Sequence, residues 1–370
     1  MRRVVVFLAL ALVAESAGEW KVAVPDYAWS FPRDHWAHDG YRTEWWYFTG
    51  QLASEGDPER RFGYQFTLFR IGVVEQAPRL DSDWAATHAV MGHAAITDFR
   101  SKTHVFSEVL YREMPLLGSF GRYPETRIGW SRGPAGTSVL WTLDWNGEGF
   151  ELAAEDARLE MGFRLETRAV KPSVFQGPNG FSRKSEAPGA ASLYYSFTRL
   201  ETSGDLTLEG ERFRVGGESW MDKEFSSSHL GPDQIGWDWF SLQLDDGREL
   251  MLYLMRARDG TVDYARGTLV SRAGEPRYLG REAIALEPRQ QWTSPESGAR
   301  YPIGWRIRLE DEGLDLRVRA LVDDQENRSA LPGGVYYWEG AVSVTGPEGE
   351  PLGRGYVELT GYGEGSRPPV

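Results

Sequence analysis

The chain has 370 residues, of which 41% are hydrophobic, and it carries a formal net charge of −13. A chain of this length usually forms two domains or one large one, and its acidic character disfavours nucleic acid as a partner. Because the sequence contains no cysteine, disulfides, thiolate catalysis and zinc–cysteine sites are excluded.

The N-terminal segment predicts export. Arg2 and Arg3 precede a short apolar run over residues 4–14, and small residues precede a cleavage position near Ser16. Residues 1–17 therefore read as a secretory signal peptide, and the apolar run is too short for a comfortable membrane span. We expect a periplasmic or secreted protein, with an uncleaved anchor as the alternative.

The remainder of the chain predicts an all-β fold. The 15 Trp, 16 Tyr and 17 Phe favour strands, and the 42 Gly and 20 Pro supply turns. Residues 138–145 and 314–321 alternate between apolar and polar side chains, and Asn146-Gly147 is a hairpin-turn signal. Many short strands at this spacing are typical of barrels or sandwiches.

An internal repeat divides the chain. Residues 45–52 and 237–244 share aromatic positions and a Gln-Leu pair at a constant offset of 237 − 45 = 192. Each segment is followed by a turn and by a second strand-like run that ends in an arginine. We interpret this as one hairpin used in two related β domains, covering residues 18–216 and 217–370. Chance similarity between two amphipathic hairpins is the alternative.

Glu44 opens the most aromatic string of the chain, Glu-Trp-Trp-Tyr-Phe over residues 44–48. In a strand, Glu44 and Trp46 share one face, and Trp45 lies on the other. A carboxylate buried beside aromatic rings would have a raised pKa and could hold a proton near neutrality. The alternative is a partly wet Glu44 that pairs with Arg42.

A second acidic segment lies at residues 219–225. Strand alternation places Trp220, Asp222 and Glu224 on one face. Two carboxylates beside a tryptophan could share a proton and serve as acid and base. A solvent-facing strand of mixed charge is the alternative.

A third acid, Asp238, lies between Trp237 and Trp239 and therefore points away from both. Its own face otherwise carries apolar residues, which would raise its pKa. The aromatic run ending at Trp338, next to Glu339, is a weaker candidate of the same kind.

Histidine chemistry has one candidate, His93, which lies among small residues in a predicted strand. It is either a functional base or a hydrogen-bonded structural histidine. We expect no metal and no cofactor, because metal-binding, phosphate-loop and dinucleotide motifs are missing. The sequence also lacks a Gly-x-Ser-x-Gly elbow, which argues against a serine hydrolase of that fold.

Several strings together resemble a known family. The carotenoid 1,2-hydratase (hydroxyneurosporene synthase) family has similar segments at residues 41–50, 93–98, 219–225, 236–240, 337–340 and 355–362. The resemblance runs from about residue 25 to residue 362. It implies two lipocalin-like antiparallel β-barrel domains. With its signal peptide, the chain is more similar to the exported AttH-like branch, described as predicted secreted hydrolases, than to the carotenoid-hydrating branch.

Three functions remain open for such a protein. A non-catalytic carrier or chaperone for an apolar, isoprenoid or lipid-like ligand is slightly favoured, with an export system as a partner. The alternatives are an acid–base enzyme of hydratase type acting on a C=C bond, and a secreted hydrolase. We expect a monomer in each case.

The predicted site draws on two groups of residues. Acid or base roles are assigned to Asp222, Glu224, Asp238, Glu44 and His93. Contacts with the ligand are assigned to Trp45, Trp46, Tyr47, Trp220, Trp237, Trp239 and Trp338, whose ring faces would also attract a carbocation.

Overall fold

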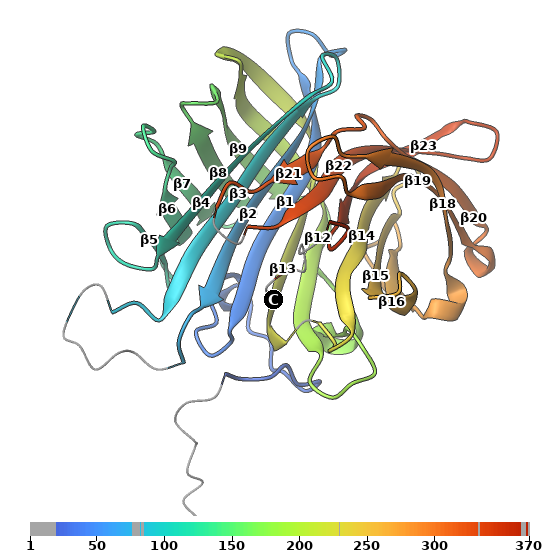
Figure 1. Ribbon diagram of the computed structural model, residues 1–370, viewed down its shortest axis with the longest axis horizontal. Coiled ribbons are helices and arrows are strands. Elements are labelled where there is room, and N and C mark those ends of the chain that lie inside the picture. The colour runs from blue at the N-terminus through green and yellow to red at the C-terminus, as the bar shows by residue number, and fades with distance from the viewer. Residues whose placement is uncertain are drawn as a thin grey trace, which may run out of the picture.

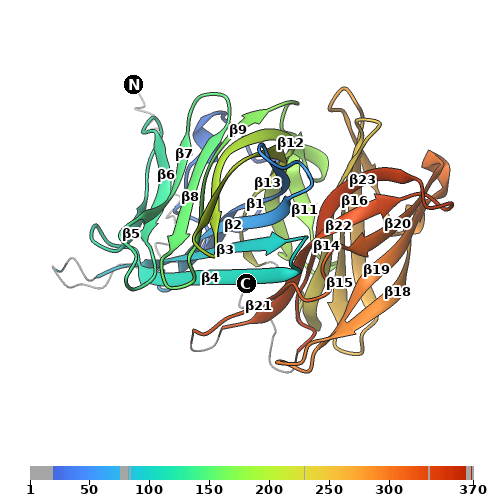
Figure 2. The same ribbon diagram turned by 90° about the horizontal axis from the view of Figure 1, so that it is seen from above.

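The computed structural model describes residues 20–75, 82, 85–228, 230–331, 334–363 and 368. Two antiparallel sheets, each strongly curled, lie side by side (Figures 1 and 2). The predicted all-β fold with two lipocalin-like barrels is therefore confirmed. The predicted signal peptide, residues 1–17, lies outside the described residues.

The first sheet forms a nearly closed barrel with the strand order β4-β3-β2-β1-β13-β12-β9-β8-β7-β6-β5, and β10 and β11 also pair with β12. Its strands are β1 (Thr43–Ser54), β2 (Arg61–Gly72), β3 (His88–Asp98), β4 (Thr103–Arg112), β5 (Gly118–Phe120), β6 (Arg127–Arg132), β7 (Leu140–Trp145), β8 (Phe150–Asp156), β9 (Met161–Ala169), β10 (Val174–Phe175), β11 (Phe181–Arg183), β12 (Ala191–Leu208) and β13 (Glu211–Ser228).

The second sheet has the order β17-β16-β15-β14-β23-β22-β20-β19-β18, and β21 also pairs with β22. Its strands are β14 (Gln234–Leu244), β15 (Glu249–Ala257), β16 (Val262–Val270), β17 (Pro276–Leu279), β18 (Ala285–Thr293), β19 (Arg300–Leu309), β20 (Leu314–Ala320), β21 (Glu326–Arg328), β22 (Tyr336–Thr345) and β23 (Pro351–Leu359).

Helical structure within the described ranges is limited to short 3-10 turns, η1 (Arg33–His35), η2 (Pro178–Gly180), η3 (Arg281–Ala283) and η4 (Glu310–Glu312). No helix in this part of the chain has the length and apolar character needed to cross a membrane.

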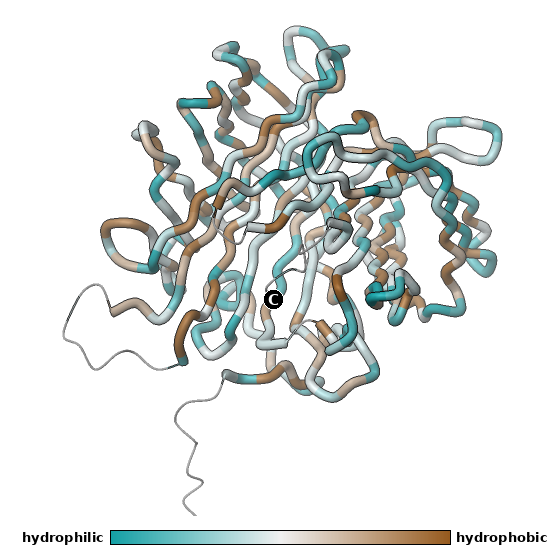
Figure 3. Tube along the Cα trace, viewed as in Figure 1, coloured by the Kyte–Doolittle hydropathy of each residue, from teal (hydrophilic) through white to brown (hydrophobic). Residues whose placement is uncertain are grey.

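Alternating hydropathy along the strands builds one core inside each barrel (Figure 3). In β20, Leu316 and Val318 are buried, whereas Arg317 and Arg319 on the opposite face are exposed. Strand β1 departs from this pattern, because almost every residue in it is buried. One of its faces packs into the first core and the other against the second barrel, and a strand covered on both sides reads as a continuous apolar run.

The change of sheet comes later in the chain than the predicted boundary. Gly216 and Gly217 lie inside β13, and the second sheet begins only at Gln234. The glycines are not a linker: a Cβ added at Gly217 would collide with the backbone oxygen of Gln51. Glycine at this position lets β13 approach β1 closely.

The two barrels meet through equivalent strands of the internal repeat. The amide of Gln51 donates to the carbonyl oxygen of Val342 at 2.9 Å, in the second barrel. The amide of Gln243, which is 192 positions later, donates to Thr198 O at 2.9 Å, in the first barrel. Such reciprocal contacts are expected where two similar units are related by an approximate two-fold axis.

Candidate functional site

The site is built on the outer faces of β1 and β13, which pair in antiparallel register. Tyr47 lies opposite Asp222, and Trp45 lies opposite Glu224. Residues directly opposite each other share a face, so both pairs point away from the first core and towards the second barrel. Strand β1 therefore places Trp45 and Tyr47 between the two barrels.

The second barrel covers this face with β14 and β23. The Trp239 ring lies 5.1 Å from the Tyr47 ring and 6.3 Å from the Trp220 ring, both in edge-to-face geometry. Trp237 packs against the same cluster of buried aromatic residues between the barrels. Trp45, Tyr47, Trp220, Asp222, Glu224, Trp237 and Trp239, all predicted from the sequence, thus come together at one interface.

Asp222 is the best-anchored acid of this interface and is 3% exposed. Its Oδ1 accepts hydrogen bonds from Ser196 Oγ at 2.5 Å and from Trp220 Nε1 at 2.6 Å. Its Oδ2 accepts one from Tyr194 Oη at 2.5 Å. Burial raises the pKa of Asp222 to about 7, although these donors oppose the shift. Asp222 can therefore exchange a proton near neutral pH.

Glu224, the other predicted acid on β13, is held in a salt bridge. Its Oε1 lies 2.7 Å from Lys184 Nζ, and it also accepts a hydrogen bond from Ser192. The Lys184 ammonium lies 4.9 Å from the Tyr194 ring centroid and 4.4 Å from that of Tyr253. Lys184 thus places a cation at this end of the interface.

Two further acids, Glu339 and Glu358, come from the second barrel and lie directly opposite each other on β22 and β23. Glu358 is half-buried and accepts a hydrogen bond from Trp237 Nε1 at 2.9 Å. Burial raises the pKa of Glu358 to about 7, and the charge of Asp222 adds to the shift. Burial and the charge of Glu358 raise the pKa of Glu339 well above its ordinary value.

Sequence reasoning missed Glu358 and ranked Glu339 low. Alternation from Tyr356 could have placed Glu358 on the same face of its strand as that aromatic ring. The pairing of Glu358 with Glu339 depends on the register between β22 and β23, for which the sequence contains no local signal.

His93 bridges the two barrels at the edge of the same interface. Its Nδ1 lies 2.7 Å from Tyr337 Oη, and the two rings stack with centroids 5.7 Å apart. Burial lowers the pKa of His93 to about 3, so the imidazole is neutral. Its hydroxyl partner is a tyrosine and not a serine, which leaves the hydrolase hypothesis without a nucleophile at this position.

The structure does not bring Glu44 and Trp46 to this interface. They point into the first barrel, where Glu44 forms ion pairs with Lys223 and with Arg70 at 3.0 Å, and His38 Nδ1 lies 2.6 Å away. These cations hold the pKa of Glu44 well below its usual range in spite of complete burial. The predicted raised pKa is wrong for Glu44, and the arginine that pairs with it comes from β2 and not from position 42.

Asp238 and Trp338 point into the second barrel. Asp238 Oδ1 accepts hydrogen bonds from Arg256 Nε at 2.9 Å and from Tyr362 Oη at 3.0 Å. Burial raises the pKa of Asp238 and Arg256 opposes the shift. Trp338 is fully buried in the second core, and its Nε1 donates to Asp323 O at 2.8 Å.

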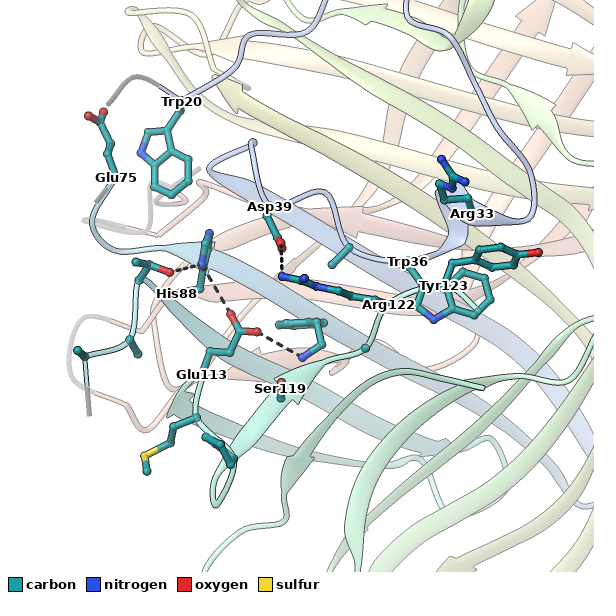
Figure 4. Close-up of a pocket in the computed structure, with 18 residues that line it drawn as sticks. Trp20, Arg33, Trp36, Asp39, Glu75, His88, Glu113, Ser119, Arg122 and Tyr123 are labelled. Carbon is teal, nitrogen blue, oxygen red and sulfur yellow. Dashed lines mark hydrogen bonds and ion pairs between the residues drawn. The ribbon is translucent and has the colours of Figure 1, made fainter. Parts of the chain in front are cut away.

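The structure has a large cavity at one end of the first barrel and a very small one between the barrels. A cavity of about 720 Å³ opens at the end of the first barrel, between the N-terminal segment and β5 (Figure 4). Its wall includes Trp36, Tyr123, His88 and Glu113. A much smaller cavity of about 10 Å³ lies between the barrels beside Trp220, and its volume suits about one water molecule.

Metal chemistry finds no support in the described ranges, where no group of three or more His, Asp or Glu residues is arranged to hold an ion.

Comparison with known proteins places the chain in a family. A crystal structure of an AttH-type protein from Nitrosomonas europaea has a TM-score of 0.80 and 31% identity, covering 92% of this chain and 99% of that one. Kievitone hydratase from Nectria haematococca has a TM-score of 0.64 and 12% identity, covering 93% and 96%. CghA with Sch210972 has a TM-score of 0.50 and 14% identity, covering 87% and 89%.

No curated protein sequence matches the chain. The profile of the family described as AttH-like, however, matches residues 22–362, which include both barrels. The chain therefore belongs to the AttH-like family.

Proposed function

We propose that the protein is an acid–base enzyme that adds water to, or removes it from, a C=C bond of an apolar substrate held between the two barrels. Asp222 is the proton donor. The observation that carries the proposal is the burial of this acid, whose pKa of about 7 lets it be protonated at neutral pH and still give up its proton.

The surroundings of Asp222 suit such a step. Protonating an alkene carbon creates a cation, and aromatic faces attract cations through their quadrupoles. The rings of Tyr47, Trp220 and Trp239 lie within one buried cluster around the acid. Burial also keeps bulk water from the cation, so that only a positioned water would react.

The rim of the cluster is formed by its less buried members. Trp45, Trp237 and Glu358 are half-buried, whereas Asp222 and Tyr47 are buried. An apolar chain could enter over the two indoles, with its reacting end towards Asp222. A hydratase role also agrees with the fold, since kievitone hydratase has the same architecture.

The test uses two acyclic isoprenoid alkenes, lycopene and squalene, incubated in water enriched in oxygen-18. The wild type is expected to add one labelled water, seen by mass spectrometry. Asp222→Asn should lower the rate by about 10² to 10⁴-fold, the usual contribution of general acid catalysis. Glu151→Gln, an exposed substitution on β8, is the control. A folded Asp222→Asn variant with the wild-type rate would overturn the assignment.

A carrier is the second candidate, and the open cavity of about 720 Å³ at the end of the first barrel, where Trp36 and Tyr123 lie among charged residues, is the place where it would hold a ligand (Figure 4). Native mass spectrometry of protein from the periplasmic fraction tests it, together with the proposed export. A co-purifying lipid that is lost in a Trp36→Ala variant and retained in Asp222→Asn would favour the carrier. A lipid that the wild type converts would favour the enzyme.

A further inference from the structure

We propose that the two barrels supply opposite halves of the reaction: Asp222 from the first barrel is the acid, and Glu358 from the second is the base that activates water, which Glu339 and Tyr47 hold in place. This inference rests on the proposed function and assigns the attacking side of the same site.

The internal repeat relates the two acids. Tyr47 lies opposite Asp222 on β13, and Trp239, 192 positions after Tyr47, lies opposite Glu358 on β23. The rings of Tyr47 and Trp239 touch each other, as equivalent residues do at a two-fold axis. Asp222 and Glu358 are therefore equivalent positions, one in each barrel, on the two sides of the same aromatic contact.

The third strand makes the two acids different. Opposite Asp222, β12 places Ser196, which donates a hydrogen bond. Opposite Glu358, β22 places a second carboxyl group, Glu339. Like charges directly across a strand pair are unfavourable, so the pair is stable when one of the two carries a proton. Asp222 is thus surrounded by fixed donors, whereas Glu358 has a partner with which it can share a proton.

Buried polar atoms whose hydrogen bonding is incomplete offer a position for the water. Both carboxyl oxygens of Glu339 and the hydroxyl of Tyr47 are buried and lack a hydrogen bond of good geometry to any described residue. Glu339 is 2% exposed and Tyr47 is 7% exposed. The Tyr47 hydroxyl lies close enough to the Glu339 carboxyl group to interact with it through a long hydrogen bond, and the charges of Glu339 and Glu358 raise the pKa of Tyr47. Burying such groups without well-formed hydrogen bonds is unfavourable, and a bound polar group would offset that cost.

The pKa shifts of Glu339 and Glu358 agree with their different roles, one holding the water and the other accepting its proton. The raised pKa of Glu339 favours its protonated form, while Glu358, with a pKa of about 7, is ionised in a large fraction of molecules at neutral pH. A water that accepts a hydrogen bond from Glu339 or Tyr47 could donate one to the Glu358 carboxylate. The half-buried position of Glu358 also lets it return its proton to solvent.

The hydration step balances in atoms and charge. The Asp222 carboxyl O–H bond breaks as its proton forms a C–H bond at one alkene carbon. The water oxygen forms a C–O bond at the other carbon, and one water proton passes to the Glu358 carboxylate. The alkene gains H and OH, Asp222 is left ionised and Glu358 protonated. Loss of a proton from Glu358 to solvent and uptake of one by Asp222 restore the enzyme.

An infrared titration tests the carboxyl pair without any substrate. The C=O stretch of protonated carboxyl groups is followed from pH 4 to pH 9 in the full-length protein. Glu358→Gln removes the neighbouring charge and should lower the pKa of Glu339, so that the band of Glu339 disappears at a lower pH than in the wild type. Glu151→Gln is the matched control, because Glu151 lies opposite Glu166 in an exposed pair. An unchanged Glu339 titration in Glu358→Gln would overturn the pair.

The pH profile of hydration tests the two roles. The wild-type rate with lycopene or squalene should fall on both sides of neutrality, since Glu358 must be ionised and Asp222 protonated. Glu358→Gln should lower the rate about 100-fold or more and abolish the acidic limb, whereas Asp222→Asn should abolish the alkaline limb. Loss of hydration in Asp222→Asn with an unaltered Glu358→Gln variant would overturn this inference alone. An inactive wild type with an intact carboxyl pair would overturn the proposed reaction and with it the base role.

Discussion

Replacing Asp222 with asparagine should change how the stability of the protein depends on pH. Asp222 has a folded-state pKa of about 7, against 3.8 for the free group. Between these values the folded state holds a proton that the unfolded state has lost, so the wild type loses stability as pH rises from about 4 to about 7. Asparagine does not titrate, so the variant lacks this loss.

The magnitude follows from the size of the shift. About three pKa units correspond to about 4 kcal/mol over the whole titration, at 1.36 kcal/mol per unit. Of this change in the free energy of unfolding, about 3 kcal/mol falls between pH 5 and pH 8. Asparagine also disturbs the hydrogen bonds from Tyr194 and Ser196, but that cost is nearly constant with pH. The pH dependence therefore reports the ionisation of Asp222 together with its effect on the pKa of Glu358.

The assay is urea unfolding of wild type and Asp222→Asn at pH 5 and at pH 8. The free energy of unfolding of the variant minus that of the wild type should be about 3 kcal/mol larger at pH 8 than at pH 5, so that the variant gains stability relative to the wild type as pH rises. Glu151→Gln should give the same difference at both pH values. An Asp222→Asn difference that does not change with pH would show that Asp222 has an ordinary pKa, and the acid role would be lost.

Two further substitutions test the packing around the site by urea unfolding. Glu44→Gln leaves the charges of Lys223 and Arg70 buried without their partner. It should therefore lower the free energy of unfolding by about 3–5 kcal/mol. A loss below about 1 kcal/mol would contradict this. Gly50→Ala places a Cβ 2.7 Å from the backbone of β13 and should cost about 1–3 kcal/mol, whereas Gly56→Ala, with its nearest neighbour at 3.9 Å, should be nearly neutral.

The sequence predicted the fold because its signals are local. Alternation, turns and aromatic runs identified the strands, and the repeated hairpin indicated two similar units. The repeat also contained a signal that went unused. The arginines that end the two runs, Arg70 and Arg256, pair with Glu44 and Asp238, each on the neighbouring strand. Their presence in both copies could have identified these two acids as partners of buried arginines.

The candidate site was only partly predictable, because alternation assigns residues to a face without saying what covers it. Trp45 and Trp46 are neighbours in sequence, yet one lies between the barrels and the other beside Lys223 in the first core. The partners of Asp222 come from β12 and those of Glu358 from β22. These contacts depend on long-range strand register, which no local pattern reports.

The chemistry of the site depends on both barrels being present. The face of β1 and β13 that carries Tyr47 and Asp222 would be an ordinary solvent-facing sheet surface in a single barrel, and an exposed carboxyl group keeps an ordinary pKa. The second barrel removes that face from water and adds Glu358 at the equivalent position. Burial of Asp222 and partial burial of Glu358 then follow from the interface itself and not from the core of either barrel. On this proposal, two copies of one hairpin packed face to face give a carboxyl group of each barrel a raised pKa, which is the property that acid–base catalysis near neutral pH requires.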